Sequence, residues 1–593
     1  MLSLKELCDG LGRLAKPGYF IIFLLKHKAR AREPELMSLP FRDILPAMEK
    51  IIKPVSAFFF HYQKLFFFLL TVVLSAFILF PVHDLQVGLA QGDHGRDLYA
   101  FSQTMRGAAP YQDYFWTYGP LMPYVYGLIF KVLGASIQSA LAGEILFALL
   151  ATAFFYLALS CFVPLFWASL AAVWFASFYA HFPHTFNHAG GVSVLIFLYL
   201  MLACYVKTKD RKFLGLGFVA LVVLSLIKLN FGLCGFTVFL LSGLLIELYD
   251  GTVKQTWRFY LFAALASVGA VVLVHLWFIR GLALYYVLQC FSLLKSYQQT
   301  GYAAGASVTQ NISALLQGAW AQIAAFWPFQ LVAGMAAGSL AFLAVTLKNG
   351  RHGHDFKREV ALSLGIAVIF AVLCLHEAFL TVMPYAKNWA QPFLILLIFL
   401  VITLAAPKAP RALQVVLAFF LAAVIWTNTQ RLHRVIHFFK NPLQHFQIGR
   451  NNAYVTNSAN WFLTIHQTVY FLNTTLGPKE LFFALPYEPL YYFLTEKQSP
   501  TKEIEFFTFM NIPPAQEQEI IANLENKKVN YIVLSNRCRS DEAGLGVFGK
   551  DHCPLLARYI LENFTVVASF GDWDQPAGWI ENHAVRVLKR NGV

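Results

Sequence analysis

Four charged or titratable residues stand close together at one point of the chain, soon after its first long apolar segment. They are Asp93, His94, Arg96 and Asp97, and residues 65–82 before them are almost wholly apolar and long enough to cross a bilayer. A carboxylate at a membrane surface is well placed to take a proton from the hydroxyl group of a reactant that meets a lipid-linked substrate there. The same four residues are equally compatible with a solvated loop that caps the membrane-spanning segment.

Further polar residues fall in segments that we expect on the same side of the membrane. Several of them lie at or inside the boundary of an apolar segment, where an ionisable group is costly and usually functional. The sequence therefore predicts one basin of acids, cations and histidines that faces outward. Its members are Asp113, Tyr118, His181, His184, Asn187, His188, Lys228, Asn230, Arg280, Lys295, His376, Glu377, Lys387 and Asn388.

The composition is that of a polytopic α-helical membrane protein. Of the 593 residues, 58% are hydrophobic and only 13% are charged, which leaves too few polar groups to cover a soluble protein of this length. Apolar runs of the length that spans a bilayer recur along the chain. They predict about eleven transmembrane helices, near residues 64–82, 138–160, 163–180, 191–206, 213–229, 232–249, 259–279, 328–347, 359–375, 390–406 and 411–427.

The net charge of +14 is explained by the membrane and not by a nucleic-acid partner, because the basic residues sit in alternate loops. Basic loops face the cytoplasm, which places the N-terminus inside and the C-terminus outside the cytoplasmic membrane. This orientation requires that residues 119–134, which are apolar but short and contain Pro120 and Pro123, lie along the interface and do not cross.

Three regions follow from these patterns. Residues 1–62 form a basic, amphipathic cytoplasmic region, and residues 63–430 form the transmembrane domain, with an outer loop at 83–118 and an interfacial helix at 119–134. Residues 431–593 form a periplasmic or extracellular α/β domain. Within it we expect strands at 481–485, 529–534, 565–570 and 584–588, and helices at 514–526 and 553–563.

Two cysteines, Cys538 and Cys553, fall in this predicted outer domain. Disulfides persist in an oxidising compartment, so we expect these two residues to be joined. The alternative is a pair of buried thiols that do not react with each other. The other six cysteines lie in or near apolar segments or in the N-terminal region and behave as small hydrophobic residues.

The stretch that begins at Asp93 resembles the first outer loop of GT-C glycosyltransferases, such as the protein O-mannosyltransferases and the aminoarabinose transferases of lipid A. The resemblance lies in residues 93–100 (DHGRDLYA), 106–115 (RGAAPYQDYF), 119–121 (GPL) and 133–134 (LG). The family pattern is an Asp-Glu pair, an aromatic helix, a G-x-P-Y-x-D turn, a K-P-P-L turn and an interfacial helix. About eleven spans followed by an outer α/β domain also match that family.

The resemblance implies that Asp93 is the catalytic base. The chain departs from the family pattern at several points: the second acid is His94, Tyr118 precedes the Gly-Pro turn where the lysine is missing, and a metal ligand of some relatives falls on Trp116. The second acidic site of the family is occupied by residues 187–188, Asn-His. No metal site is assigned.

The sequence leaves a divalent metal open as a cofactor, because three histidines have a spacing that metal ligands can use. His181, His184 and His188 have i, i+3 and i+7 spacing, which would place three ligands on one helix face. Pro183 and the pair at 190–191, Gly-Gly, favour a loop instead, in which the histidines would contact a sugar.

The activity that the resemblance implies is inverting transfer of a sugar from a polyprenyl-phosphate donor to a hydroxyl on a lipid, glycan or protein acceptor. The protein would act in the cytoplasmic (inner) membrane, among membrane lipids and without a nucleic-acid partner. The residues expected to bind substrate are His94, Arg96, Asp97, Asp113, Tyr118, His184, His188, Lys228, Arg280 and Lys387. A transporter or flippase of lipid-linked sugars is the alternative, favoured by Glu144 inside a predicted span.

Overall fold

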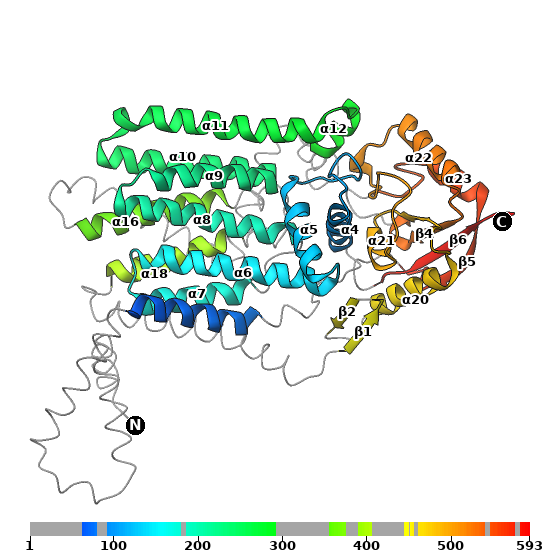
Figure 1. Cartoon of the computed structure of the whole chain (residues 1–593), viewed down its shortest axis with the longest axis horizontal. Coiled ribbons are helices and arrows are strands. Elements are labelled where there is room, and N and C mark those ends of the chain that lie inside the picture. The colour runs from blue at the N-terminus through cyan, green and yellow to red at the C-terminus, as the bar shows by residue number, and fades with distance from the viewer. Residues whose placement is uncertain are drawn as a thin grey trace, which may run out of the picture. The chain divides into compact units, whose positions relative to one another are not determined.

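The computed structural model in Figure 1 describes residues 62–79, 92–179, 186–291, 355–374, 389–405, 444–449, 451–455, 460–539, 546–575 and 582–592. The chain divides into two units, Met1–Thr71 and Val72–Val593. The described part of the first unit is the beginning of a helix, Tyr62–Leu79, and everything below concerns the second unit.

Long apolar helices form the part of the second unit that precedes the C-terminal strands. Helices that follow one another in the chain pack side by side, as α6 does with α7 and α8, and α9 does with α10 and α11. The connections from α8 to α11 are short, and a single extended residue, Lys228, separates α9 from α10. The helices are α6 (Ile137–Ser160), α7 (Leu165–Tyr179), α8 (Phe186–Thr208), α9 (Lys212–Ile227), α10 (Leu229–Asp250), α11 (Val253–Ile279), α12 (Leu284–Phe291), α16 (Asp355–Leu373) and α18 (Gln391–Ala405).

Among the described residues, five helices are long and apolar enough to cross a membrane: Tyr62–Leu79, α6, α8, α10 and α11. Helix α9 and the apolar parts of α7 and α18 are shorter, at 10–17 residues. The first seven predicted spans and those near 359–375 and 390–406 all fall on helices. The predicted spans at 328–347 and 411–427 lie outside the described residues, as does the predicted amphipathic region 1–61.

The predicted outer loop contains a helix, α4 (Asp93–Met105), which corrects the expectation of a loop at Gly92–Tyr99. Leu98, Phe101 and Met105 recur at helical spacing, and the first two are fully buried. The sequence pattern did not predict this helix, because its polar residues are buried together with its apolar residues. A second short helix, α5 (Leu121–Leu133), packs on α4.

Both short helices run across the direction shared by α6 to α11 (Figure 1). Helix α5 has 13 residues and is therefore about 20 Å long, too short to cross a hydrocarbon core of about 30 Å. A helix of this length is what the sequence predicts at 119–134. Its position at the membrane interface stays a prediction.

The C-terminal α/β region, residues 460–592, is built around a four-stranded sheet with the order β3-β4-β6-β5. Strands β3 and β4 are parallel, and β6 pairs antiparallel with β4 on one side and β5 on the other. The strands are β3 (Phe482–Leu485), β4 (Tyr531–Ser535), β5 (Phe564–Phe570) and β6 (Val585–Arg590), and the helices are α20 (Asn460–Thr475), α21 (Pro489–Leu494), α22 (Pro514–Asn526) and α23 (Pro554–Asn563). A separate hairpin, β1 (Gln444–Ile448) and β2 (Asn451–Val455), precedes it.

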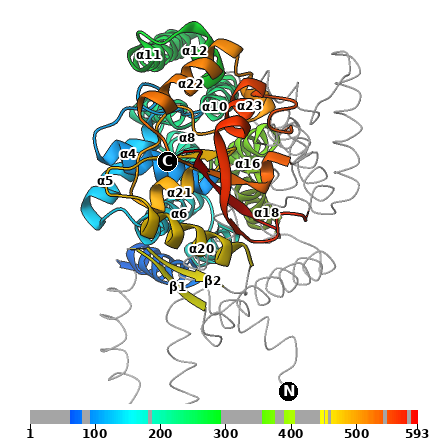
Figure 2. The same cartoon turned by 90° about the vertical axis from the view of Figure 1, so that its right-hand side faces the viewer.

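Helices cover both faces of the sheet, so β3 and β4 consist almost wholly of apolar residues, whereas β6 includes Arg586 and Lys589. Phe483 and Leu485 pack with α22 and α23 in one hydrophobic cluster, whereas Phe482 and Ala484 belong to another cluster that includes α20. This alternation follows from the period of two along a strand. Figure 2 shows α20 on one side of the strands and α22 and α23 on the other.

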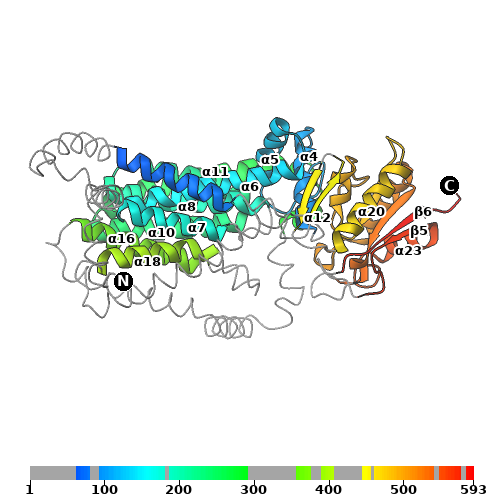
Figure 3. The same cartoon turned by 90° about the horizontal axis from the view of Figure 1, so that it is seen from below.

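The second of these clusters joins the C-terminal α/β region to the short helices. It contains Phe101 and Tyr126 of α4 and α5 together with Tyr491 and Tyr492 of α21. Figure 3 shows α4 between the long helices and the C-terminal region. One hydrophobic core therefore holds α4 in place from both sides.

The predicted disulfide between Cys538 and Cys553 is not present, because both residues are free thiols. Cys538 packs against Trp573 and Ala584, whereas Cys553 lies in the cluster formed by α22 and α23. The two cysteines thus fill different parts of the core as small apolar side chains.

Candidate functional site

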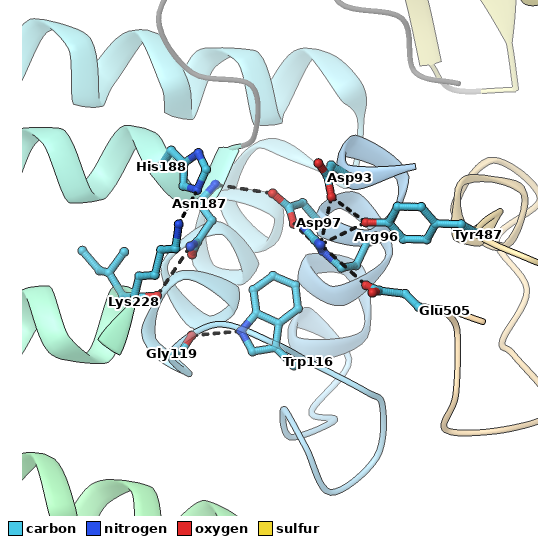
Figure 4. Close-up of polar contacts among 11 residues, drawn as sticks. Asp93, Arg96, Asp97, Trp116, Gly119, Asn187, His188, Lys228, Tyr487 and Glu505 are labelled. Atoms are coloured by element: carbon cyan, nitrogen blue, oxygen red, sulfur yellow. Dashed lines mark hydrogen bonds and ion pairs between the residues drawn. The ribbon is translucent and has the colours of Figure 1, made fainter. Parts of the chain in front are cut away.

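A buried arginine, Arg96, forms the centre of the candidate site (Figure 4). Its Nη1 lies 2.9 Å from Oδ1 of Asp93 and 3.6 Å from Oε1 of Glu505, and its Nη2 lies 3.0 Å from Oδ1 of Asp97. Nη1 also donates to the hydroxyl of Tyr487 at 2.9 Å. The guanidinium is planar and always charged, so it can hold three acids and a phenol in one fixed arrangement.

Asp93 is the acid of this group that reaches solvent, with 41% of its side chain exposed. It occupies the first turn of α4, where the helix dipole favours a negative charge. The hydroxyl of Tyr487 donates to its Oδ1 at 2.6 Å, and Arg96 contacts the same oxygen. Among the described residues, the hydrogen bond and the ion pair of Asp93 both involve Oδ1 and not Oδ2.

The other two acids, Asp97 and Glu505, are buried. Burial raises the pKa of Asp97 to about 6 and that of Glu505 to about 7, and the charge of Arg96 opposes both shifts. The backbone N–H of Asn187, in the first turn of α8, donates to Oδ2 of Asp97 at 3.4 Å. Asp97 therefore ties α4 to α8 and holds Arg96 in place.

Tyr118 connects this acidic group to a second, cationic group. The guanidinium of Arg96 lies 4.7 Å from the centre of the Tyr118 ring, and Nζ of Lys228 lies 5.6 Å from the same ring. Nζ of Lys228 is also 3.4 Å from Nε2 of His188 and 4.4 Å from the ring of Phe231. A cation and an imidazole surrounded by aromatic rings could bind an anionic group such as a phosphate.

Close backbone contacts fix the turn that carries Tyr118. The N–H of Gly119 donates to the carbonyl of Ile227 at 2.9 Å, and Nε1 of Trp116 donates to the carbonyl of Gly119 at 2.9 Å. A Cβ at Gly119 would lie 2.0 Å from the carbonyl oxygen of Leu226, so only glycine allows this approach. The turn thereby lies beside Lys228, which follows Ile227.

The structure brings together seven predicted site residues. Asp93, Arg96 and Asp97 share the acidic group, and Tyr118, His188 and Lys228 form the cationic group beside it. His94 lies on α4, where it packs edge-on against Phe186 at 5.2 Å. Asn187 and His188 belong to the first turn of α8, and Gly190–Gly191 lie inside that helix, so the loop that this glycine pair suggested is wrong.

Two predicted residues have other contacts. Asp113 is exposed, and its Oδ2 accepts from the N–H of Ala109 at 2.7 Å, which stabilises a turn. The guanidinium of Arg280 lies over Trp277 at 3.6 Å, at the end of α11. Neither residue contacts the acidic group. His181, His184, Lys295, His376, Glu377, Lys387 and Asn388 lie outside the described residues.

Within the described ranges, no group of three or more His, Cys, Asp or Glu side chains could hold a metal ion. Around Arg96, the acids are paired with the guanidinium, as the ion-pair distances show. His181 and His184 lie outside the described ranges, so the structure does not test a metal site that includes them.

The sequence did not reveal that Tyr487 and Glu505 belong to the site. Tyr487 is 391 positions from Arg96 and lies two residues before the start of α21. Glu505 is followed by Phe506 and Phe507, and it is buried. The two aromatic residues beside it were the one feature of the sequence that could have indicated this burial. Nothing in the local spacing links either residue to α4.

No protein-family model matches the chain, and no curated protein matches it either. Two similar solved structures are ArnT from Cupriavidus metallidurans bound to undecaprenyl phosphate and the oligosaccharyltransferase AglB from Archaeoglobus fulgidus in complex with an inhibitory peptide and a dolichol-phosphate. ArnT is 14% identical with a TM-score of 0.46 and covers 89% of this chain and 98% of its own. AglB is 12% identical with a TM-score of 0.43 and covers 84% of this chain and 72% of its own.

At such identities and scores, these two likenesses carry no argument about this chain. The functional proposal rests on the side chains of the site.

Proposed function

We propose that the protein is a membrane glycosyltransferase of the GT-C type, with Asp93 as its catalytic base. It transfers a sugar from a polyprenyl-phosphate donor to a hydroxyl acceptor on the outer side of the cytoplasmic membrane, with inversion at the anomeric carbon. The observation that supports this most directly is the exposed carboxylate of Asp93, held through one oxygen by Arg96 and Tyr487.

The chemistry needs one base. The acceptor hydroxyl gives its proton to Oδ2 of Asp93 as its oxygen forms a bond to the anomeric carbon. The bond between that carbon and the phosphate oxygen breaks, through a transition state with oxocarbenium character. A phosphate leaves with its electron pair and needs no proton, so a second carboxylic acid is not required.

The leaving phosphate needs positive charge near it. The charge of Arg96 is directed to three carboxylates, whereas Lys228 lies beside His188 and between aromatic rings. We therefore assign the phosphate to Lys228 and His188. Undecaprenyl phosphate and dolichol-phosphate, the lipids bound in the two structural neighbours, are carriers of the proposed kind.

The test supplies radiolabelled polyprenyl-phosphate sugars to membranes that contain the wild type, Asp93→Asn or Asp210→Asn, and sorts the labelled products into lipid, polysaccharide and protein. We expect Asp93→Asn to insert normally and to transfer sugar about 10²–10⁴-fold more slowly, the usual contribution of a general base. Asp210 is exposed in the loop between α8 and α9, and its variant should match the wild type.

Wild-type transfer by Asp93→Asn would exclude Asp93 as the base. Movement of labelled lipid across the bilayer without a new glycosidic bond would favour a transporter instead, for which Glu144 on α6, half-buried in the structure, is the relevant acid.

A further inference from the structure

The hydroxyl of Tyr487 takes part in two hydrogen bonds at once. It donates to Oδ1 of Asp93 at 2.6 Å and accepts from Nη1 of Arg96 at 2.9 Å. Because Arg96 also contacts Oδ1 directly, three groups form a closed triangle. A carboxylate held at one oxygen by two donors cannot rotate freely, so its second oxygen keeps one direction.

Packing fixes the ring of Tyr487 in turn. The residue is 4% exposed, and its ring meets that of Phe507 edge-on at 5.0 Å. Gly92 lies directly against the ring, since a Cβ there would be 2.2 Å from Cδ1 of Tyr487. Gly92 has φ +84°, a backbone conformation that favours glycine. The glycine before the proposed base thus makes room for this side chain.

A second glycine, Gly95, continues the contact one turn along α4. A Cβ at Gly95 would lie 2.7 Å from the backbone nitrogen of Leu490 in α21. Two glycines on one face of α4 therefore let α21 and Tyr487 approach the helix backbone. Glu505, from the same C-terminal α/β region, contributes a further carboxylate 3.6 Å from Arg96.

We propose that Tyr487 is a positioning residue for the transfer reaction, so that the C-terminal α/β region completes the active site. This inference rests on the proposed function, because it takes Asp93 to be the base. Tyr487 acts through Asp93: it holds Oδ1 and so directs Oδ2 toward the acceptor hydroxyl. No covalent step involves the phenol.

Tyr487→Phe tests this assignment, since it removes the hydroxyl and keeps the ring. We expect kcat to fall about 10–100-fold, because a misdirected base lowers the rate without changing ground-state binding. The KM values for donor and acceptor should stay within about twofold, as expected for an interaction that acts in the transition state.

Tyr491→Phe and Tyr492→Phe are matched controls. Both residues lie on α21 and are as deeply buried as Tyr487, and their hydroxyls hydrogen-bond away from Asp93: Tyr491 with His583 and Tyr492 with the N–H of Ala484. Their variants should lose thermal stability at least as much as Tyr487→Phe but keep kcat. Equal losses of kcat in all three variants would show that Tyr487 is structural, and an unchanged kcat in Tyr487→Phe would overturn the proposal.

A double-mutant cycle separates this inference from the proposed function. Adding Tyr487→Phe to Asp93→Asn should lower the residual rate no further, because the tyrosine acts through the carboxylate. If Asp93→Asn is fully active, the proposed function fails. If Asp93→Asn is slow while Tyr487→Phe is normal, or if the two effects multiply in the double variant, only the role of Tyr487 fails.

Discussion

The hydroxyl of Tyr487 lies 2.6 Å from Oδ1 of Asp93, across 394 positions of sequence. This hydrogen bond joins a helix that follows the first apolar segment to the turn before α21 in the C-terminal α/β region. The proposed base and the group proposed to orient it therefore come from distant parts of the chain. A change in how the C-terminal region packs on α4 should be visible first in the rate of transfer.

The buried acids make stability depend on pH. Their folded-state pKa values, about 6 for Asp97 and about 7 for Glu505, exceed the usual values of 3.8 and 4.5. A raised pKa means that the folded state binds the proton more tightly than the unfolded state does. The contribution of these two acids to the stability of the fold is therefore complete below about pH 4, and it is lost as the pH rises toward 7. The unfolding temperature of the purified protein in detergent should fall across that range.

Glu505→Gln should flatten this pH dependence and raise the unfolding temperature at pH 8 relative to the wild type. Glu562, exposed on α23, offers a matched control, and Glu562→Gln should keep the wild-type slope. A slope that is the same in Glu505→Gln and the wild type would contradict the pKa assigned to Glu505.

Removing Arg96 should destabilise the fold, because it leaves the fully buried Asp97 without its cation. Loss of one partner of a buried ion pair costs about 3–5 kcal/mol. Arg96→Met should therefore lower the unfolding temperature in detergent strongly, and Arg96→Met with Asp97→Asn should recover part of the loss. A double variant no more stable than Arg96→Met would show that Asp97 is not the group left uncompensated.

Gly95→Ala tests the close contact between α4 and α21. The new methyl group would meet Leu490, and overpacking of this kind costs about 1–3 kcal/mol. Gly269 on α11 is also helical, but no heavy atom lies within 4 Å of the place that a Cβ there would occupy, so Gly269→Ala should be neutral or stabilising by up to about 1 kcal/mol. Denaturation curves in detergent compare the two, and equal effects would rule out the contact.

Lys228→Gln should weaken binding of the donor. A charge-assisted hydrogen bond is worth about 1.5–3 kcal/mol, so the KM for the polyprenyl-phosphate sugar should rise roughly 10–100-fold. Lys254→Gln, at an exposed position at the start of α11, is the control. If Lys228→Gln keeps the wild-type KM while Arg280→Gln raises it, the phosphate binds at the end of α11 instead.

The two cysteines of the C-terminal region should both react with an alkylating reagent once the protein is denatured, without any reductant. They are free thiols in separate clusters. Burial raises the pKa of Cys538 to about 12 and that of Cys553 further, so labelling of the native protein should be slow. Mass spectrometry of the labelled peptides measures the labelling rates of the native and the denatured protein. If neither cysteine were labelled after denaturation, the two would be joined in a disulfide.

Elements with a strong pattern of their own could be predicted from the sequence. Strands β3, β4, β5 and β6 lie within two residues of the predicted runs, and α22 has the predicted bounds. Strands β3 and β4 are buried on both faces, which gives nearly continuous apolar segments between clear turn residues. The long helices were found for the same reason, since a lipid-facing surface keeps a whole segment apolar.

The site could be predicted only in part, because several of its contacts join residues that are distant in sequence. Asp93, Arg96 and Asp97 were recognised by their spacing, whereas Tyr487 and Glu505 reach them through packing between α4 and the C-terminal region. Helix α4 was predicted as a loop because its polar side chains, such as Arg96, are buried against partners that the local sequence does not show. In a sequence, a charged residue that is paired inside the fold cannot be distinguished from one that is solvated.

The distance in sequence between Asp93 and Tyr487 also sets an order in time during synthesis. At roughly 5–20 residues per second, about 20–80 s separate translation of the two residues. During that interval the nascent chain has Asp93 and Arg96 but lacks the phenol that we propose to orient the carboxylate. A copy that stops before Tyr487 should insert its long helices yet transfer sugar slowly, so incomplete products should consume little of the lipid-linked donor.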